Sequence, residues 1–150
     1  SDVCSSDLTA PHNFGTAPTR GASTADTFKA ALYVTTATVN ASTTAYSATN
    51  EVSGTGYTAG GVTVTNATPP ASTNTSSTAG TAYWTPSASI TYTSVTLTTA
   101  FDAVLIYNST QSNKAVSVHT FGSQTVTAGT FTLTMPSNTT STALLRLATT

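Results

Sequence analysis

The stretch from Asn50 to Asn66, NEVSGTGYTAGGVTVTN, holds four closely spaced glycines, as loops that cradle phosphate groups do. These are Gly54, Gly56, Gly60 and Gly61. A dinucleotide-binding loop needs Gly-x-Gly-x-x-Gly between a strand and a helix, and a Walker-type loop needs Gly-Lys-Ser/Thr. The spacing here fits neither, and the VTVTN that follows alternates like a strand, so no helix N-terminus is expected to receive a phosphate. We interpret the glycines as a structural turn around Tyr57 and predict a positive φ for at least one of them.

Nucleophilic catalysis would need a histidine and an acid beside one of the many serines and threonines. The histidines are His12 and His119, and the acids outside the N-terminal segment are Asp26, Glu51 and Asp102. A hydrolase, or a glycosidase with paired carboxylates, would have to be assembled from these few residues, which lie in different segments. We favour a solvated or locally bonded His119 and predict that the protein is not an enzyme.

The same scarcity limits metal binding. A zinc site needs three or four ligands, and two histidines with the single Cys4 fall short of a convincing set. We therefore predict no metal and no cofactor. A calcium site built from the three acids and backbone carbonyls is kept as an alternative.

A group of aromatic residues could line a flat sugar-binding platform or a protein interface: Tyr57, Tyr83, Trp84, Tyr92 and Tyr107. Aromatic side chains of this kind are more often part of a core or an interface, because each removes a large apolar surface from water. Both interpretations stay open at this point.

Composition narrows the class of partner. Charged residues make up 6% of the chain and the net charge is −1, so no basic stripe exists and we predict no nucleic acid partner. No apolar run is long enough for a membrane-spanning helix, and we predict no membrane partner. The polar residues are mainly β-branched threonine, 38 residues against 19 serines, and threonine favours strands whose faces carry hydroxyl groups instead of charges.

Period-two alternation predicts the strands. Residues 26–36 place Phe28, Ala30, Leu32 and Val34 on one face. The series is completed by residues 61–66, 81–86, 89–99, 102–108, 114–121, 124–136 and 142–149, of which the last could instead be a short helix. Residues 102–108, DAVLIYN, contain a continuous apolar run, which is typical of a strand covered on both faces. We expect Val116 and Val118 to share a face, the strand before Pro86 to lie at an edge or to stop there, and residues 67–80 to form a surface loop.

The first residues differ from the rest of the chain. The string DVCSSDL, residues 2–8, resembles a translated sequencing adapter, and residues 9–25 are rich in Pro, Gly, Thr and Ser. We expect residues 1–25 to be an artefact followed by a flexible arm, with residues 1–8 packed against nothing, and residues 26–150 to form one domain. The fold predicted for that domain is all-β: an antiparallel β-sandwich, jelly-roll-like or immunoglobulin-like, of about seven to nine strands, preceded by the extended N-terminal arm.

The order of several blocks resembles a family of small structural proteins of tailed-phage virions. The blocks are DTFKAALY, NEVSGTGYTAGGVTVTN, the Trp84 strand with SITYTSVTLTTAFDAVLIYN, and FGSQTVTAGTFTLTMP. They cover residues 26–135, and the glycine turn is the most specific part. The chain departs from the family in its N-terminal arm, in the STAGTAY before Trp84, and in the Ser/Thr-rich residues after Pro136.

The resemblance implies a non-enzymatic virion structural protein, such as a capsid decoration protein or a neck or tail component, located in the virion. It implies contact with other virion proteins and carries no catalytic residues over. The few charges and the strand edges with few lysines predict a homo-oligomer, and a trimer is the first expectation because capsid surfaces offer threefold sites. The alternative is a carbohydrate-binding or adhesin-like β-sandwich on an extracellular surface, with a host glycan as partner. An adhesin-like internal amide bond would involve Lys29 or Lys114 beside Glu51 or Asp102.

Overall fold

The computed structural model describes residues 2–3, 26–65, 70–73 and 80–148. The arm predicted over residues 9–25 lies outside them. The described residues form eight strands and no helix: β1 (Asp2–Val3), β2 (Phe28–Val34), β3 (Val62–Val64), β4 (Ala71–Ser72), β5 (Thr81–Trp84), β6 (Ile90–Asn108), β7 (Lys114–Leu133) and β8 (Leu145–Ala148). The fold is all-β and sandwich-like, as predicted.

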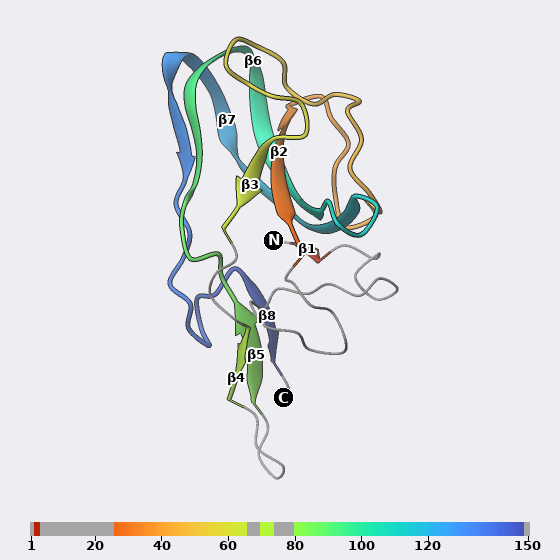
Figure 1. Cartoon of the computed structure of the whole chain (residues 1–150), viewed down its shortest axis with the longest axis vertical. Helices are drawn as coiled ribbons and strands as arrows, with labels where there is room; N and C mark the ends of the chain where they lie inside the picture. The colour runs from red at the N-terminus through yellow and green to blue at the C-terminus, as the bar shows by residue number, and fades with distance from the viewer. Residues whose placement is uncertain (1, 4–25, 66–69, 74–79, 149–150) are drawn as a thin grey trace.

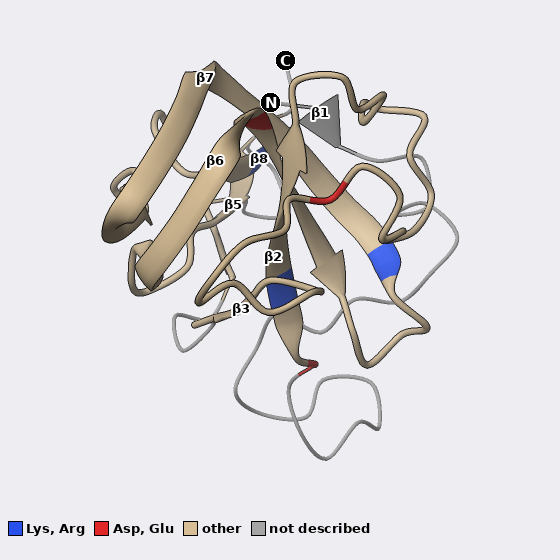
Figure 2. Cartoon of the chain, turned by 90° about the horizontal axis from the view of Figure 1, so that it is seen from above, with Lys and Arg blue, Asp and Glu red and all other residues tan. Residues whose placement is uncertain are grey.

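Two antiparallel sheets contain these strands. The larger has the order β1-β7-β6-β2-β3 and the smaller the order β4-β5-β8. The smaller sheet lies at one end of the molecule, and β7 runs along one side (Figure 1 and Figure 2). β5 stops before Pro86, as expected, but it is the central strand of its sheet.

The hairpin of β6 and β7 forms both layers of the sandwich. Alternation predicts two separate strands in place of each, yet each runs unbroken, for 19 and 20 residues. Their pairing shifts register repeatedly between Tyr92 and Ala103. Such shifts are β-bulges, which bend strands, and residues with positive φ lie at Ser94 and Ala128. The start of β6 and the end of β7 therefore fold over the remainder of the sheet (Figure 1).

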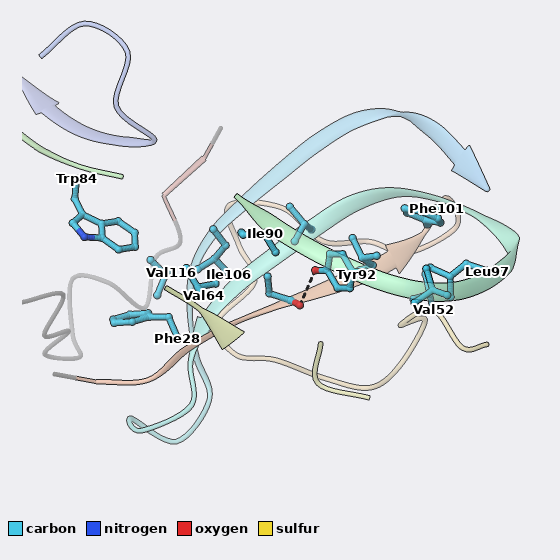
Figure 3. Packing of buried hydrophobic residues seen from close by; sticks show 14 residues of the cluster. Phe28, Val52, Val64, Trp84, Ile90, Tyr92, Leu97, Phe101, Ile106 and Val116 are labelled. Carbon is cyan, nitrogen blue, oxygen red and sulfur yellow. Dashed lines mark hydrogen bonds between the residues drawn. The ribbon is translucent and has the colours of Figure 1, made fainter. Parts of the chain in front are cut away.

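The main core lies between the two layers. Phe28, Ala30 and Leu32 of β2 are fully buried there, and Ile90 and Tyr92 of the folded-over part of β6 pack against them (Figure 3). The predicted apolar face of β2 is thus confirmed. Trp84 of the smaller sheet joins the same core, with its ring centroid 6.2 Å from that of Phe28.

A second cluster covers the opposite face of the larger sheet. Ala31 and Tyr33 of β2 and Leu105 and Tyr107 of β6 are buried there under Tyr46 and other residues of the connection after β2. Val104 and Ile106 belong to the main core. The continuous apolar run at the end of β6 is therefore covered on both faces, as predicted.

A β-bulge overturns the expected placement of Val116 and Val118. Ile106 pairs with Ser117 and Tyr107 pairs with Ala115, so Val116 is an extra residue in β7. Val116 enters the main core, whereas Val118 lies in the second cluster on the other face. The prediction that they share a face is wrong because an extra residue breaks the two-residue period.

Two short strands also differ from expectation. Asp2 and Val3 pair with Val118 and Ser117 of β7, so the prediction that residues 1–8 pack against nothing is wrong at β1. Because the edge of β7 presents unpaired backbone groups, an extended segment can add to it whatever its side chains. Within the predicted loop of residues 67–80, β4 pairs with β5.

Candidate functional site

The glycine turn makes two successive bends, one on each side of Tyr57. The Tyr57 amide donates to the Gly54 carbonyl (3.2 Å), and the Gly61 amide donates to the Thr58 carbonyl (2.9 Å). The prediction of positive φ is confirmed at three glycines: Gly56 (78°), Gly60 (90°) and Gly61 (72°).

Close backbone approach explains why glycine is needed on both sides of this turn. A Cβ on Gly61 would lie 1.7 Å from the carbonyl oxygen of Ala30 in β2, and one on Gly54 would lie 2.0 Å from that of Thr96 in β6. The Thr96 amide donates to the Thr55 carbonyl (2.9 Å). The turn is therefore held directly against both layers of the sandwich, and no phosphate-binding loop is formed.

The carboxylate of Glu51 ties the turn together. Its Oε1 accepts hydrogen bonds from the hydroxyl of Tyr57 (2.7 Å) and the amide of Gly60 (2.8 Å). Its Oε2 accepts one from the hydroxyl of Tyr46 (2.6 Å). The Tyr107 hydroxyl donates to the Gly60 carbonyl (2.8 Å). We call Glu51, Tyr46, Tyr57, Gly60 and Tyr107 the Glu51 cluster.

The phenols of this cluster are poor acids. Burial is the main cause that raises the pKa of Tyr46, Tyr57 and Tyr107, and the negative charge of Glu51 adds to it. They remain hydrogen-bond donors through the whole physiological range. The rings are also engaged, since those of Tyr46 and Tyr107 stack at 4.7 Å. The arrangement is suited to fixing the turn and offers neither a nucleophile nor a free base.

The predicted aromatic platform is not formed. Trp84, Tyr92 and Tyr107 are at most 3% exposed, so they belong to the core and cannot present a flat surface to a sugar. The Tyr57 ring is half-buried and stacks on that of Tyr92 (5.9 Å). Tyr83 is half-buried on β5. Burial therefore assigns Trp84, Tyr92 and Tyr107 to the core and not to a sugar-binding platform.

Among the described residues, Ser117 and His119 form a contact between a hydroxyl and a base. The Ser117 Oγ lies 3.0 Å from the His119 Nε2. Ser117 is completely buried, where a substrate could not reach it. His12 lies outside the described residues. Ser117 and His119 lie close together because they share one face of β7. Since Ser117 is buried, the pair does not form an accessible catalytic centre.

The acids are not gathered into one site. Asp26 is buried and accepts hydrogen bonds from Asn108 Nδ2 (2.7 Å) and Gln111 Nε2 (3.4 Å), which fastens the start of β2 to the β6–β7 turn. Glu51 belongs to its own cluster, and Asp102 lies on β6. Within the described residues no group of three His, Cys, Asp or Glu side chains could hold a metal ion.

A shallow cavity of about 310 Å³ lies beside the Glu51 cluster. Its lining is neutral: Tyr33, Ala37, Thr38, Val39, Thr43, Ala45, Ser47, Thr49 and Asn50. Two of its lining residues are joined by a hydrogen bond from the Tyr33 hydroxyl to the Ser47 carbonyl (2.6 Å). Sequence reasoning missed this site because residues 36–50 show no alternation; the bridge between Ala45 and Lys114 is too short to give a pattern.

Comparisons of the chain with protein-family models, with curated proteins and with solved structures find no match. Among the described residues, no helix is long and apolar enough to cross a membrane.

Proposed function

We propose that this chain is a non-enzymatic structural protein of a bacteriophage virion, either a capsid decoration protein or a component of the neck or tail. It acts through assembly contacts with copies of itself and with other virion proteins, and it resides in the particle. The resemblance of residues 26–135 to tailed-phage virion proteins is the source of this proposal. No nucleic acid, membrane or cofactor takes part.

One structural observation supports an assembly role above the others. The folded-over part of the β6–β7 hairpin exposes the side chains of Thr91, Thr93, Thr130 and Thr132 and carries no charged residue. A neutral surface of this kind lacks the charge repulsion that keeps soluble domains apart. Such a surface suits a subunit that is covered in its working state.

Three side chains that could take part in catalysis are buried or hydrogen-bonded within the protein, which also supports a structural role. Glu51 is held by three donors, Asp26 is buried against Asn108, and Ser117 is inaccessible. None of these three groups is available to meet a substrate. Their hydrogen bonds and burial therefore point to a role in stabilising the fold and not in catalysis.

The test is the presence of the protein in particles. Virions should be purified by density gradient and analysed by mass spectrometry for peptides of this chain, and recombinant protein should be added to particles from a phage that lacks the gene. We expect the chain to sediment with wild-type particles and to bind the deficient ones. Recovery only in the soluble lysate, with no binding to deficient particles, would contradict the proposal.

A second candidate function is recognition of a surface glycan, for which the neutral cavity is the supporting observation. Hydroxyl groups of Thr43 and Thr49 and the amide of Asn50 offer uncharged partners for sugar hydroxyls. Replacing Ala45 by Trp should fill the cavity. A glycan array on which the native protein binds and Ala45→Trp does not would favour this candidate, and no binding by either would remove it.

A further inference from the structure

Among the described residues, the outer edge of β7 has no partner over most of its length. Within the described part of the chain, β7 has β6 on one side. On the other side β1 pairs at Val118 and Ser117, and Ala45 forms a bridge with Lys114. Beyond these residues the edge continues to Leu133 with no neighbouring strand among the described residues. β7 is the outermost strand of the folded-over layer in both views (Figure 1 and Figure 2).

This edge lacks the features that usually prevent strand addition. From Thr120 to Met135 the chain has no Lys, Arg, Asp, Glu or Pro, and the part of β7 beside its label is tan in Figure 2. Exposed edges are normally protected by charged residues, by proline or by bulges. The bulge at Ala128 ends before Gly129, and β7 then pairs regularly with β6 through Phe131, Thr132 and Leu133.

The last part of this edge is complementary to itself. Phe131, Leu133 and Met135 pack against the main core, whereas Thr130, Thr132 and Thr134 are exposed. An antiparallel pair related by a twofold axis at Thr132 sets each Thr132 opposite its copy and Phe131 opposite Leu133 of the second copy. Apolar faces then meet apolar faces, and threonine faces meet threonine faces, as an isologous contact requires.

We propose that residues 129–135 pair edge to edge with the same residues of a second copy, so that the folded-over layers of two molecules form one continuous antiparallel sheet. The chain's own β1 shows that the β7 edge accepts an antiparallel strand. In that pair Asp2 lies opposite Val118 and Val3 opposite Ser117, so β1 itself lies outside residues 129–135.

The absence of charge on this edge suits a second copy in particular. Two identical charged edges would repel each other, whereas two neutral edges bring no like-charge penalty. A contact over so few residues is smaller than a standard protein interface. The pair is therefore weak in dilute solution and is reinforced where many copies are held on one particle. The pairing of two copies on a particle rests on the proposed virion function.

Cysteine cross-linking tests the pairing directly. In a Cys4→Ser background, Thr132→Cys places a thiol on the twofold axis, and Thr91→Cys is the matched control because Thr91 pairs with Thr132 on the same face, one strand away from the edge. Antiparallel partners lie about 4.5–5.5 Å apart at Cα, within the range of a disulfide. Under mild oxidation at high protein concentration, we expect Thr132→Cys to form a disulfide-linked dimer. We expect Thr91→Cys to remain monomeric under the same conditions.

A mixing experiment checks the register independently. Thr130→Cys and Thr134→Cys proteins, each in the Cys4→Ser background, should form a mixed dimer on oxidation and few dimers alone. Absence of dimers in all variants, or equal cross-linking of Thr132→Cys and Thr91→Cys, would overturn the proposal. Failed cross-linking with retained particle binding would remove this interface alone, whereas a specific dimer that never binds particles would remove the virion function and leave the interface.

Discussion

At the scale of single residues, Gly61 carries the most constrained backbone of the turn. Its φ of 72° disfavours a side chain, and a Cβ at this position would lie only 1.7 Å from the Ala30 carbonyl oxygen. Gly61→Ala should therefore lower the free energy of unfolding by more than the roughly 1–2 kcal/mol that a left-handed conformation costs alone. Thermal unfolding should show a fall of several degrees, at about 2–4 °C per kcal/mol for a domain of this size.

Gly122→Ala is the matched control for that prediction. Gly122 has no positive φ, and a Cβ there meets no atom within 4 Å. Because alanine restricts the unfolded chain more than glycine, this substitution should leave the melting temperature unchanged or raise it slightly. Equal losses at both positions would contradict the account of the turn.

The buried phenols predict loss of stability in alkali. Burial raises the pKa of Tyr33 from its ordinary value of 10.0 to about 12, and it also raises the pKa of Tyr46, Tyr57, Tyr92 and Tyr107. Above the ordinary pKa the unfolded chain loses these protons while the folded chain keeps them, so the free energy of unfolding falls as pH rises. This contribution is complete below about pH 10 and declines through about pH 12.

Urea unfolding at a series of pH values, followed together with the ultraviolet absorbance of phenolate, measures this effect. We expect phenolate from the buried residues to appear with unfolding. Tyr33→Phe should make the decline with pH less steep, because one of the linked protons is removed. Phenolate absorbance from the buried residues in a protein that is still folded would argue against the prediction.

At the scale of elements, a side-chain hydrogen bond joins the folded-over part of β6 to β2. The Tyr92 hydroxyl donates to the Ala30 carbonyl (2.8 Å) across the main core (Figure 3). Tyr92→Phe keeps the ring and removes this bond, so it should lower the free energy of unfolding by about 1 kcal/mol. The midpoint of urea unfolding measures the loss.

Tyr83→Phe is the matched control for Tyr92→Phe. The Tyr83 hydroxyl makes no hydrogen bond within the described residues, so its removal should change the midpoint little. If Tyr92→Phe behaves like Tyr83→Phe, the interlayer bond does not contribute to holding the hairpin over the sheet.

Alternation predicted the strands well and their continuity poorly. The face of β2 and the turn at the four glycines followed from side-chain period and from backbone freedom. The bends of β6 and β7 did not, because the bulges that cause them occur at ordinary residues, including Ser94 and Ala128. The Glu51 cluster was also missed: Tyr46 and Tyr107 meet only after residues 36–50 cross the sheet, and local pattern does not encode that crossing.

At the scale of the whole molecule, a net charge of −1 and 6% charged residues leave association to apolar and hydroxyl contacts. Added salt screens charges over about 10 Å at 0.1 M and about 3 Å at 1 M, so a charge-driven interface weakens across that range. An uncharged strand edge has no such dependence. Sedimentation at high protein concentration should therefore show the same degree of self-association at both salt concentrations.

A double lysine variant of the β7 edge distinguishes specific pairing from general insolubility. Thr130→Lys with Thr132→Lys places like charges on both copies of the β7 edge and should abolish association at low salt, with partial recovery at high salt as the repulsion is screened. Thr91→Lys with Thr93→Lys adds the same charge to the neighbouring strand β6 and should retain most of the association. A monomer at every salt concentration in the unmodified protein would rule out self-association, and equal loss in both double variants would point to net charge instead of the β7 edge.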